Sequence, residues 1–494
     1  GAFEGCSSLS EVTLPKRLEK IGNAAFKKCY SIKDIKLPSA ALTYVGNESF
    51  AYCSGIEQID LPNSIKTIGF GAFRSTSLKN IILPTNSEFK TLNYAVFADC
   101  VYLSKVTIPD FVTTISDARA NGTDPVSEGT FYNCVSLEEI NLPSKLTGVG
   151  SAAFACCTNL KSISIPNTVT KIGSYTFYDC RAMEKAEIGK AVTSIGTYAF
   201  EHCKSLTEIN IPSKVTTIGQ GTFSACENLK KMTTNANIVS TGKADASFYE
   251  VLFYSDSKIC LQTFYGDDQY TVNHALEEIV FDRGVTEIGD NSFSGAAALQ
   301  RITIANSVRL IGKNAFFNCK KLYFVNTIPK SVAKIDDYAF SGCPNLKAMI
   351  IPSTVTSMGY KVFAGCVDLT IFGEAGSAAD SYVTNDNEDI SFVDIYAKIT
   401  NPQLKLTDDG VQLSWDKIDT NIKGYKIDKI VYHIYRTDLT AATPAETVIA
   451  DTENNFYLDK EVTDRHKYTY FIDCTYCFTA KDEEYTVDTS RVAI

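Results

Sequence analysis

Apolar residues recur along most of this chain in one fixed pattern. Phenylalanine returns mostly every 23 or 24 residues, and the stretch from Phe200 to Gly219 (FEHCKSLTEINIPSKVTTIG) shows one full repeat. A regular repeat of this length is the signature of a solenoid, in which each repeat forms one coil. The repeated phenylalanines are Phe3, Phe26, Phe50, Phe73, Phe97, Phe131, Phe154, Phe177, Phe200, Phe223, Phe293, Phe316, Phe340 and Phe363.

Each repeat contains a short segment of alternating polarity. Ile209 and Ile211 fall on one side of an extended strand, while Glu208 and Asn210 point the other way. Pro212 lacks an N–H donor and ends the strand. We therefore predict one half-buried strand per coil.

A second apolar pair follows in the repeat. Phe223 and Cys226 are three residues apart, a spacing that places both side chains on one face of a helical turn. A single coil cannot bury its apolar face alone, so neighbouring coils must stack. The predicted fold is a leucine-rich-repeat solenoid of about seventeen coils, with a parallel concave sheet and short helical turns on the convex side.

Two segments interrupt the repeat. Residues 117–129 are rich in Asn, Gly, Pro and Ser and predict a surface loop, either a binding loop or a tolerated solvent loop. The gap between Phe223 and Phe293 has the length of about three coils, so we expect degenerate coils near residues 230–275.

The two ends of the repeat region set the predicted domain limits. Ala2-Phe3 matches Ala25-Phe26, so the chain starts inside a coil, and we expect that upstream sequence, including a signal peptide, has been removed. The solenoid is expected to cover residues 1–394. Residues 398–494 instead show short strands rich in Val, Ile, Tyr and Thr, which predict a β-sandwich with Trp415 in its core.

These motifs resemble two known families. The L-x-x-I-x-I-P and I-G-x-x-A-F-x-x-C segments resemble the 23-residue repeats of BspA-like bacterial surface proteins. The segments VQLSW, GYKI, IVYHIYR and YTYFIDC resemble strands of a fibronectin type III domain, a module that usually acts as a spacer. The first resemblance implies a secreted or surface-anchored protein that adheres to host or bacterial proteins.

Composition and charge limit the classes of partner that this chain is expected to bind. The net charge is −10, and no run of Lys or Arg stands out, so we expect no nucleic-acid partner. No apolar stretch is long enough to span a membrane, so we expect no direct membrane insertion. Twelve of the sixteen cysteines occupy one repeat position, which is filled by Thr76 and Ala296 in two other coils. This substitution favours a packing position occupied by free thiols over disulfide bonds.

Catalytic and metal-binding patterns are weak. His202 precedes Cys203, but adjacency in sequence does not orient a nucleophile and its base. His274, His433 and His466 are isolated, and Cys474 and Cys477 form a lone C-x-x-C without a second pair. We therefore predict no catalytic site, no metal and no cofactor.

The predicted ligand-binding residues lie two and four places after each coil's leading leucine, where side chains point out of the concave face. Toward the C-terminal end they become apolar, which favours either a ligand groove or docking of the closing segment or the sandwich. The polar members are Asp34, Lys36, Gln58, Asp60, Glu139, Asn141, Glu208 and Asn210, and the apolar members are Phe324, Ala348, Ile350 and Ile371.

Two functions fit these patterns. The first is a non-enzymatic cell-surface or secreted binding protein that recognises an extracellular protein or glycan, such as a host matrix or mucus component. The alternative is a binding or structural module of a larger surface enzyme whose catalytic domain lies outside this chain.

Overall fold

The computed structural model forms two compact units. One contains Gly1–Leu299 with Gly312–Lys320, and the other contains Gln300–Ile311 with Lys321–Ile494. The structure describes residues 1–118, 126–219, 221–223, 225–234, 276–283, 285–290, 292–385, 390–463, 465–489 and 491–494.

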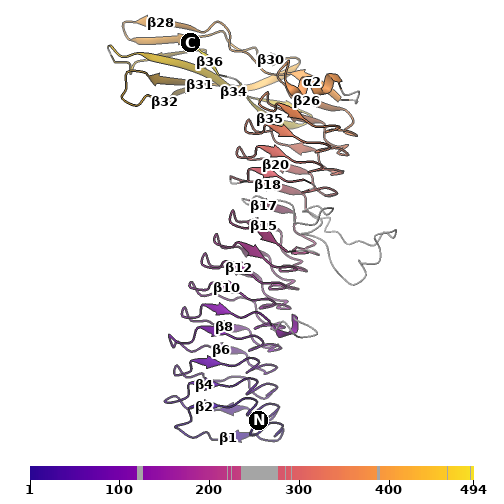
Figure 1. Cartoon of the computed structure of the whole chain (residues 1–494), viewed down its shortest axis with the longest axis vertical. Coiled ribbons are helices and arrows are strands. Elements are labelled where there is room, and N and C mark those ends of the chain that lie inside the picture. The colour runs from indigo at the N-terminus through magenta and orange to yellow at the C-terminus, as the bar shows by residue number, and fades with distance from the viewer. Residues whose placement is uncertain are drawn as a thin grey trace. The chain divides into compact units, whose positions relative to one another are not determined.

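The first unit is a solenoid of stacked coils (Figure 1). Its regular coils carry two short strands each, rather than the one strand expected, and like strands pair in parallel from coil to coil. For example, β11 (Ser162–Ser164) pairs with β13 (Lys185–Glu187), and β12 (Lys171–Ile172) pairs with β14 (Ser194–Ile195). We call the row containing β11 the first ladder and the row containing β12 the second ladder.

The remaining strands of this unit extend these two rows. The first ladder also contains β1 (Glu11–Val12), β3 (Asp34–Ile35), β6 (Asn80–Ile82), β8 (Lys105–Thr107), β15 (Glu208–Ile211), β17 (Lys231–Thr234) and β18 (Glu278–Phe281). The second also contains β2 (Lys20–Ile21), β4 (Tyr44–Val45), β5 (Thr67–Ile68), β7 (Thr91–Leu92), β9 (Thr114–Ile115), β10 (Gly148–Val149), β16 (Thr217–Ile218) and β19 (Glu287–Ile288).

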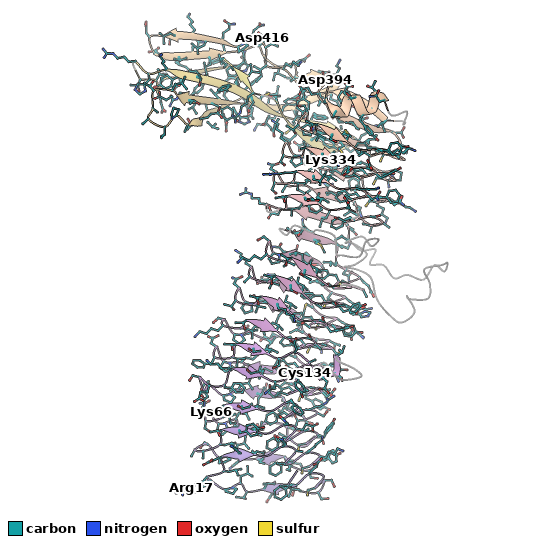
Figure 2. The ribbon with its side chains drawn as sticks, viewed as in Figure 1. Arg17, Lys66, Cys134, Lys334, Asp394 and Asp416 are labelled. Carbon is teal, nitrogen blue, oxygen red and sulfur yellow. The ribbon has the colours of Figure 1, made fainter. Side chains whose placement is uncertain are left out.

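The repeated phenylalanines stack through the interior of the coils. The ring of Phe177 lies 5.6 Å from that of Phe154 and 5.1 Å from that of Phe200, and all three side chains are fully buried. Side chains such as that of Cys134 fill the space between the coil walls (Figure 2). The predicted core position of the phenylalanines is confirmed.

The segment around each phenylalanine is a turn and not the helical turn expected. Tyr175 and Asp179, two residues either side of Phe177, have φ of 56° and 57°, in the left-handed region. The backbone N–H groups of these three residues donate to carbonyls of the next coil instead of to their own. Stacking therefore satisfies backbone groups that a helix would satisfy locally.

The two interruptions differ from each other. After the insertion a 3₁₀ turn, η1 (Val126–Glu128), leads back into the repeat, and Val126 packs beside Tyr132, Tyr175 and Tyr178. At the second interruption β17 pairs directly with β18, so the expected three coils between Phe223 and Phe293 are too many. The rest of the predicted degenerate coils, with His274, lies outside the described residues.

The coils of the second unit also have strands at these two positions. Its first-ladder strands are β20 (Arg301–Thr303), β22 (Phe324–Val325), β24 (Ala348–Ile350), β26 (Leu369–Gly373) and β27 (Ile390–Asp394), and its second-ladder strands are β21 (Leu310–Ile311), β23 (Lys334–Ile335) and β25 (Ser357–Met358). Helix α2 (Ala378–Asn385) follows β26, and the Tyr382 hydroxyl accepts a 3.4 Å hydrogen bond from the Phe363 N–H. The helix thus covers the last phenylalanine of the stack.

Two antiparallel sheets complete this unit. One contains β28 (Gln403–Thr407), β29 (Gly410–Ser414) and β33 (Phe456–Asp459). The other contains β30 (Asn421–Ile422), β31 (Tyr425–Asp438), β32 (Glu446–Thr452), β34 (Tyr468–Ala480), β35 (Glu483–Asp488) and β36 (Val492–Ala493). Trp415 is buried and its ring lies 5.0 Å from that of Tyr432, so its predicted core position is confirmed.

Candidate functional site

The outward side of the first ladder is mostly polar in the first unit, with Ile82 of β6 and Val280 of β18 as apolar exceptions. Glu208 and Asn210 are exposed on β15, while Ile209 between them is buried, as alternation along a strand requires. The eight polar residues predicted for this side are all exposed: Asp34, Lys36, Gln58, Asp60, Glu139, Asn141, Glu208 and Asn210.

Two of these residues line a groove of about 600 Å³. Glu139 and Asn141 form its wall on one coil, and Ser162 and Ser164 of β11 form it on the next. The lip of the groove is fixed by Asn167, whose Oδ1 accepts a 2.8 Å hydrogen bond from the backbone N–H of the next coil. The groove therefore presents hydroxyl, amide and carboxylate groups on a rigid frame.

Charges beside the groove are paired with each other. Lys185 Nζ lies 2.6 Å from Glu187 Oε1, and Ser164 Oγ donates to Glu187 Oε2 over 3.1 Å. These two hydrogen bonds, that from Lys185 first, lower the pKa of Glu187. Lys161 is similarly paired with Glu138 at 2.6 Å. A ligand in this groove would therefore meet polar groups and the Glu139 carboxylate, with ion pairs of neutralised charge beside it.

The apolar end of the predicted row is covered by the C-terminal sheets, all within the second unit. The ring of Phe324 lies 5.9 Å from that of Tyr485, and the Tyr485 hydroxyl donates to the Ala348 carbonyl over 3.3 Å. Ala348 and Ile350 are fully buried in a cluster with residues of both sheets. The sequence left open a ligand groove or domain docking, and the structure supports docking.

Ile371 does not belong to this row. β26 pairs with β24 so that Met349 lies opposite Ile371 and Ile350 lies opposite Phe372. Ala348 is paired with Thr370, and Ser162 is paired with Lys185. The sequence separation of the first pair is one residue shorter than that of the second. Because side chains alternate along a strand, a slip of one residue moves Ile371 to the opposite face. Phe372 takes the predicted place, 5.0 Å from the ring of Phe478.

Polar contacts surround this apolar cluster. Arg301 Nη1 lies 3.0 Å from Glu483 Oε1, and its guanidinium carbon lies 4.1 Å from the Phe324 ring centre. Lys330 Nζ donates to the Thr489 carbonyl over 3.0 Å. The sequence does not reveal these residues, because more than a hundred positions separate the ion-pair and hydrogen-bond partners and no local pattern links them.

The candidate nucleophile Cys203 is a structural thiol. It is fully buried, its Sγ donates to the Phe177 carbonyl over 3.3 Å, and burial raises its pKa well above the ordinary value. A thiolate is the reactive form of cysteine, so this environment opposes nucleophilic chemistry. Neighbouring His202 has a lowered pKa, mainly through burial.

One polar chain on the C-terminal sheets has the residue types of a catalytic triad. His433 Nδ1 lies 2.7 Å from Asp451 Oδ1, and its Nε2 lies 2.9 Å from Thr475 Oγ1. The Thr475 hydroxyl, however, donates its proton to Asp488 over 2.7 Å. His433 cannot accept the same proton, so this chain of hydrogen bonds links strands and does not activate a nucleophile.

Within the described ranges, no group of three or more His, Cys, Asp or Glu side chains could hold a metal ion. No helix in the same ranges is both long and apolar enough to cross a bilayer.

Solved structures of bacterial repeat proteins are similar to this chain. A leucine-rich repeat protein from Bacteroides ovatus ATCC 8483 is 22% identical, with 79% of this chain and 85% of that chain covered and a TM-score of 0.48. A leucine rich cell surface protein from Faecalibacterium prausnitzii A2-165 is 26% identical, with 61% and 89% covered and a TM-score of 0.28. No curated protein matches the chain.

The family model for the BspA type leucine rich repeat region matches six copies, at residues 1–121, 125–250 and 265–375. These ranges include the phenylalanine stack and every strand of the two ladders except β27. The chain therefore belongs to the BspA-type leucine-rich-repeat family.

Proposed function

We propose that this chain is a non-enzymatic binding protein of a bacterial cell surface, or a secreted one, that recognises an extracellular protein or glycan through the first ladder. The observation that carries the proposal is the groove at Glu139, Asn141, Ser162 and Ser164 within a row of mostly polar outward side chains. Hydroxyl, amide and carboxylate groups held on adjacent packed coils can hydrogen-bond a polar ligand with little loss of side-chain entropy.

The arrangement of strands in the C-terminal sheets supports the proposal that they form a fibronectin type III-like module. Leaving out the short β30, seven strands run from β28 to β35. The first, second and fifth of them (β28, β29 and β33) form one sheet. The other sheet has the order β32, β31, β34, β35, which are the fourth, third, sixth and seventh strands. This is an immunoglobulin-like division in which the fourth strand pairs with the third. In this proposal the module holds the end of the solenoid and serves as a spacer.

Binding of the intact chain to extracellular matrix proteins, mucins and a glycan array tests the function. Asn141→Arg and Ser164→Arg place bulky cations in the groove and should each weaken binding of the captured ligand at least about tenfold. Thr217→Arg, on an exposed second-ladder position, is the matched control and should bind normally.

All three variants should have the same urea midpoint of unfolding as the wild type, because each substituted side chain is exposed or partly exposed at the surface. Equal binding by the groove variants and wild type would show that the ligand contacts another surface.

A further inference from the structure

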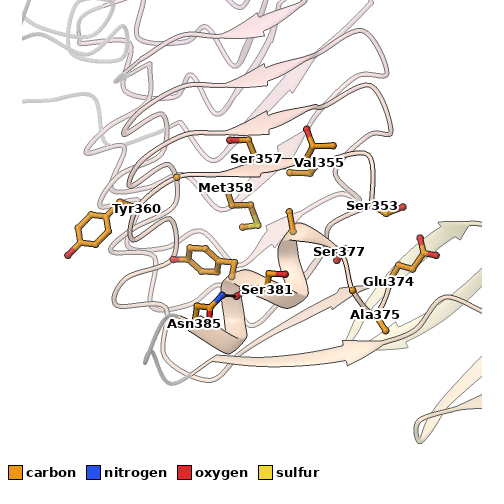
Figure 3. A pocket seen from close by; sticks show the side chains of 15 residues that line it. Ser353, Val355, Ser357, Met358, Tyr360, Glu374, Ala375, Ser377, Ser381 and Asn385 are labelled. Carbon is orange, nitrogen blue, oxygen red and sulfur yellow. Dashed lines mark hydrogen bonds between the residues drawn. The ribbon is translucent and has the colours of Figure 1, made fainter.

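The second ladder of the second unit ends beside an open groove. β25 pairs with β23 on one side and is the last strand of its sheet, and α2 packs near it. Figure 3 shows Ser357 and Met358 on the strand, with Ser381 and Asn385 on the helix; all four line the groove. Its volume is about 1080 Å³, above the usual range for small-molecule pockets.

The backbone of β25 faces this groove with unused acceptors. One coil earlier, the Ile335 carbonyl accepts from the Gly359 N–H over 2.8 Å, and the Ala333 carbonyl accepts from the Thr356 N–H over 3.0 Å. In a further coil, the equivalent backbone N–H groups would donate to the carbonyls of Met358 and Thr356. Among the residues that the structure describes, none donates to either oxygen.

The Met358 side chain is also incompletely covered. Ile311 and Ile335, at the same position of the two preceding coils, are fully buried, whereas Met358 is half-buried. An apolar side chain placed over Met358 would restore the contact that each earlier coil receives from the next. A strand added in this groove would therefore need one apolar residue, placed over Met358.

We propose that the groove between β25 and α2 binds an extended peptide segment of a partner protein, which adds to the second ladder as a parallel strand. The peptide's apolar residue covers Met358, and the N–H of the following residue donates to the Met358 carbonyl. Among the described residues that line the groove, Glu374 is the one charged side chain, so neutral or basic peptides are favoured. This site is separate from the first-ladder surface of the proposed function.

The chain's own repeat supplies a probe. A fluorescent, end-capped peptide with the sequence TVTKIGS, that of residues 168–174, carries isoleucine and then glycine in the required order. Binding to the full chain is measured by fluorescence anisotropy. N-methylation of the glycine removes the donor to Met358 and should weaken binding about fivefold or more. N-methylation of the isoleucine modifies an N–H on the other strand edge and should have a smaller effect.

Two protein variants test the location. Ser381→Arg fills the groove from α2 and should abolish peptide binding, whereas Thr384→Arg, exposed on the same helix outside the groove, should not. Met358→Asp should also abolish binding, and urea unfolding shows whether each variant is folded. Absence of binding at millimolar peptide, or binding that survives Ser381→Arg in a folded protein, would overturn the proposal.

Discussion

The Sγ atom of Cys180 donates a hydrogen bond to the backbone carbonyl of Phe154, 3.2 Å away on the preceding coil. This contact gives a second donor to a buried carbonyl that also accepts from the Cys157 N–H, at the point where the chain turns around the phenylalanine stack. It also requires a protonated thiol. The same bond joins Cys29 to Phe3, Cys53 to Phe26, Cys100 to Phe73, Cys134 to Phe97, Cys157 to Phe131, Cys203 to Phe177, Cys226 to Phe200, Cys319 to Phe293 and Cys366 to Phe340.

The first prediction concerns these thiols. The fifteen cysteines that the structure describes form no disulfide bonds with one another, and the repeat cysteines other than Cys6 are buried. We expect the twelve repeat cysteines to be reduced, with Cys6 reacting quickly with a thiol reagent and the others only after denaturation. Intact mass with and without reductant, followed by timed labelling, measures this. Several disulfides among the repeat cysteines would contradict the prediction.

The second prediction concerns alkaline pH. Burial raises the pKa of Cys53 to about 12 and that of Cys100 to about 11. An unfolded thiol ionises near pH 8.5, so between about pH 9 and pH 11 the unfolded chain loses protons that the folded chain retains. The free energy of unfolding should therefore fall across this range, by up to about 1.4 kcal/mol per pH unit for each such thiol.

Urea titrations in reductant at several pH values measure this slope. The double variant Cys53→Ala, Cys100→Ala is the control, because alanine is tolerated at this position in the coil of Phe293. Its slope should be shallower than that of the wild type. Identical slopes would mean that these two thiols do not contribute.

The third prediction concerns the phenylalanine stack. Phe177→Ala removes a fully buried ring between two others and should lower the free energy of unfolding by about 3 to 5 kcal/mol. Tyr102→Ala, at a side chain that is 57% exposed, should change it by less than about 0.5 kcal/mol. A loss below about 1 kcal/mol for Phe177→Ala would contradict the assigned core position.

The fourth prediction concerns the C-terminal sheets and the apolar end of the first ladder. A double-mutant cycle of Phe324→Ala and Tyr485→Ala in the full chain should give a coupling of about 0.5 to 1.5 kcal/mol, because the rings are in contact. A cycle of Phe324→Ala with Tyr30→Ala, an exposed residue of the other unit, should give no coupling. Independent effects of Phe324 and Tyr485 would argue against docking.

Much of this fold is determined by the sequence alone. The period of Phe and Cys identifies the coils, and the alternation around Ile209 identifies the first ladder and its exposed polar side. These features can be predicted from the sequence because each coil repeats the same local constraint. An apolar residue that points inward must do so in every coil.

Other features depend on contacts between distant residues. The second ladder consists of strands of two residues, which are too short to produce a pattern and exist only because the coils pair. The face of Ile371 depends on a one-residue slip that appears only in the pairing of β24 with β26. Phe324 and Ile350 look like an exposed patch in sequence, and only the folding of Tyr485 and its sheet against them, more than a hundred residues later, buries them. A repeat specifies how a coil meets its neighbour, but the residues that cover the last coils lie outside the repeat, so tertiary packing alone decides their contacts.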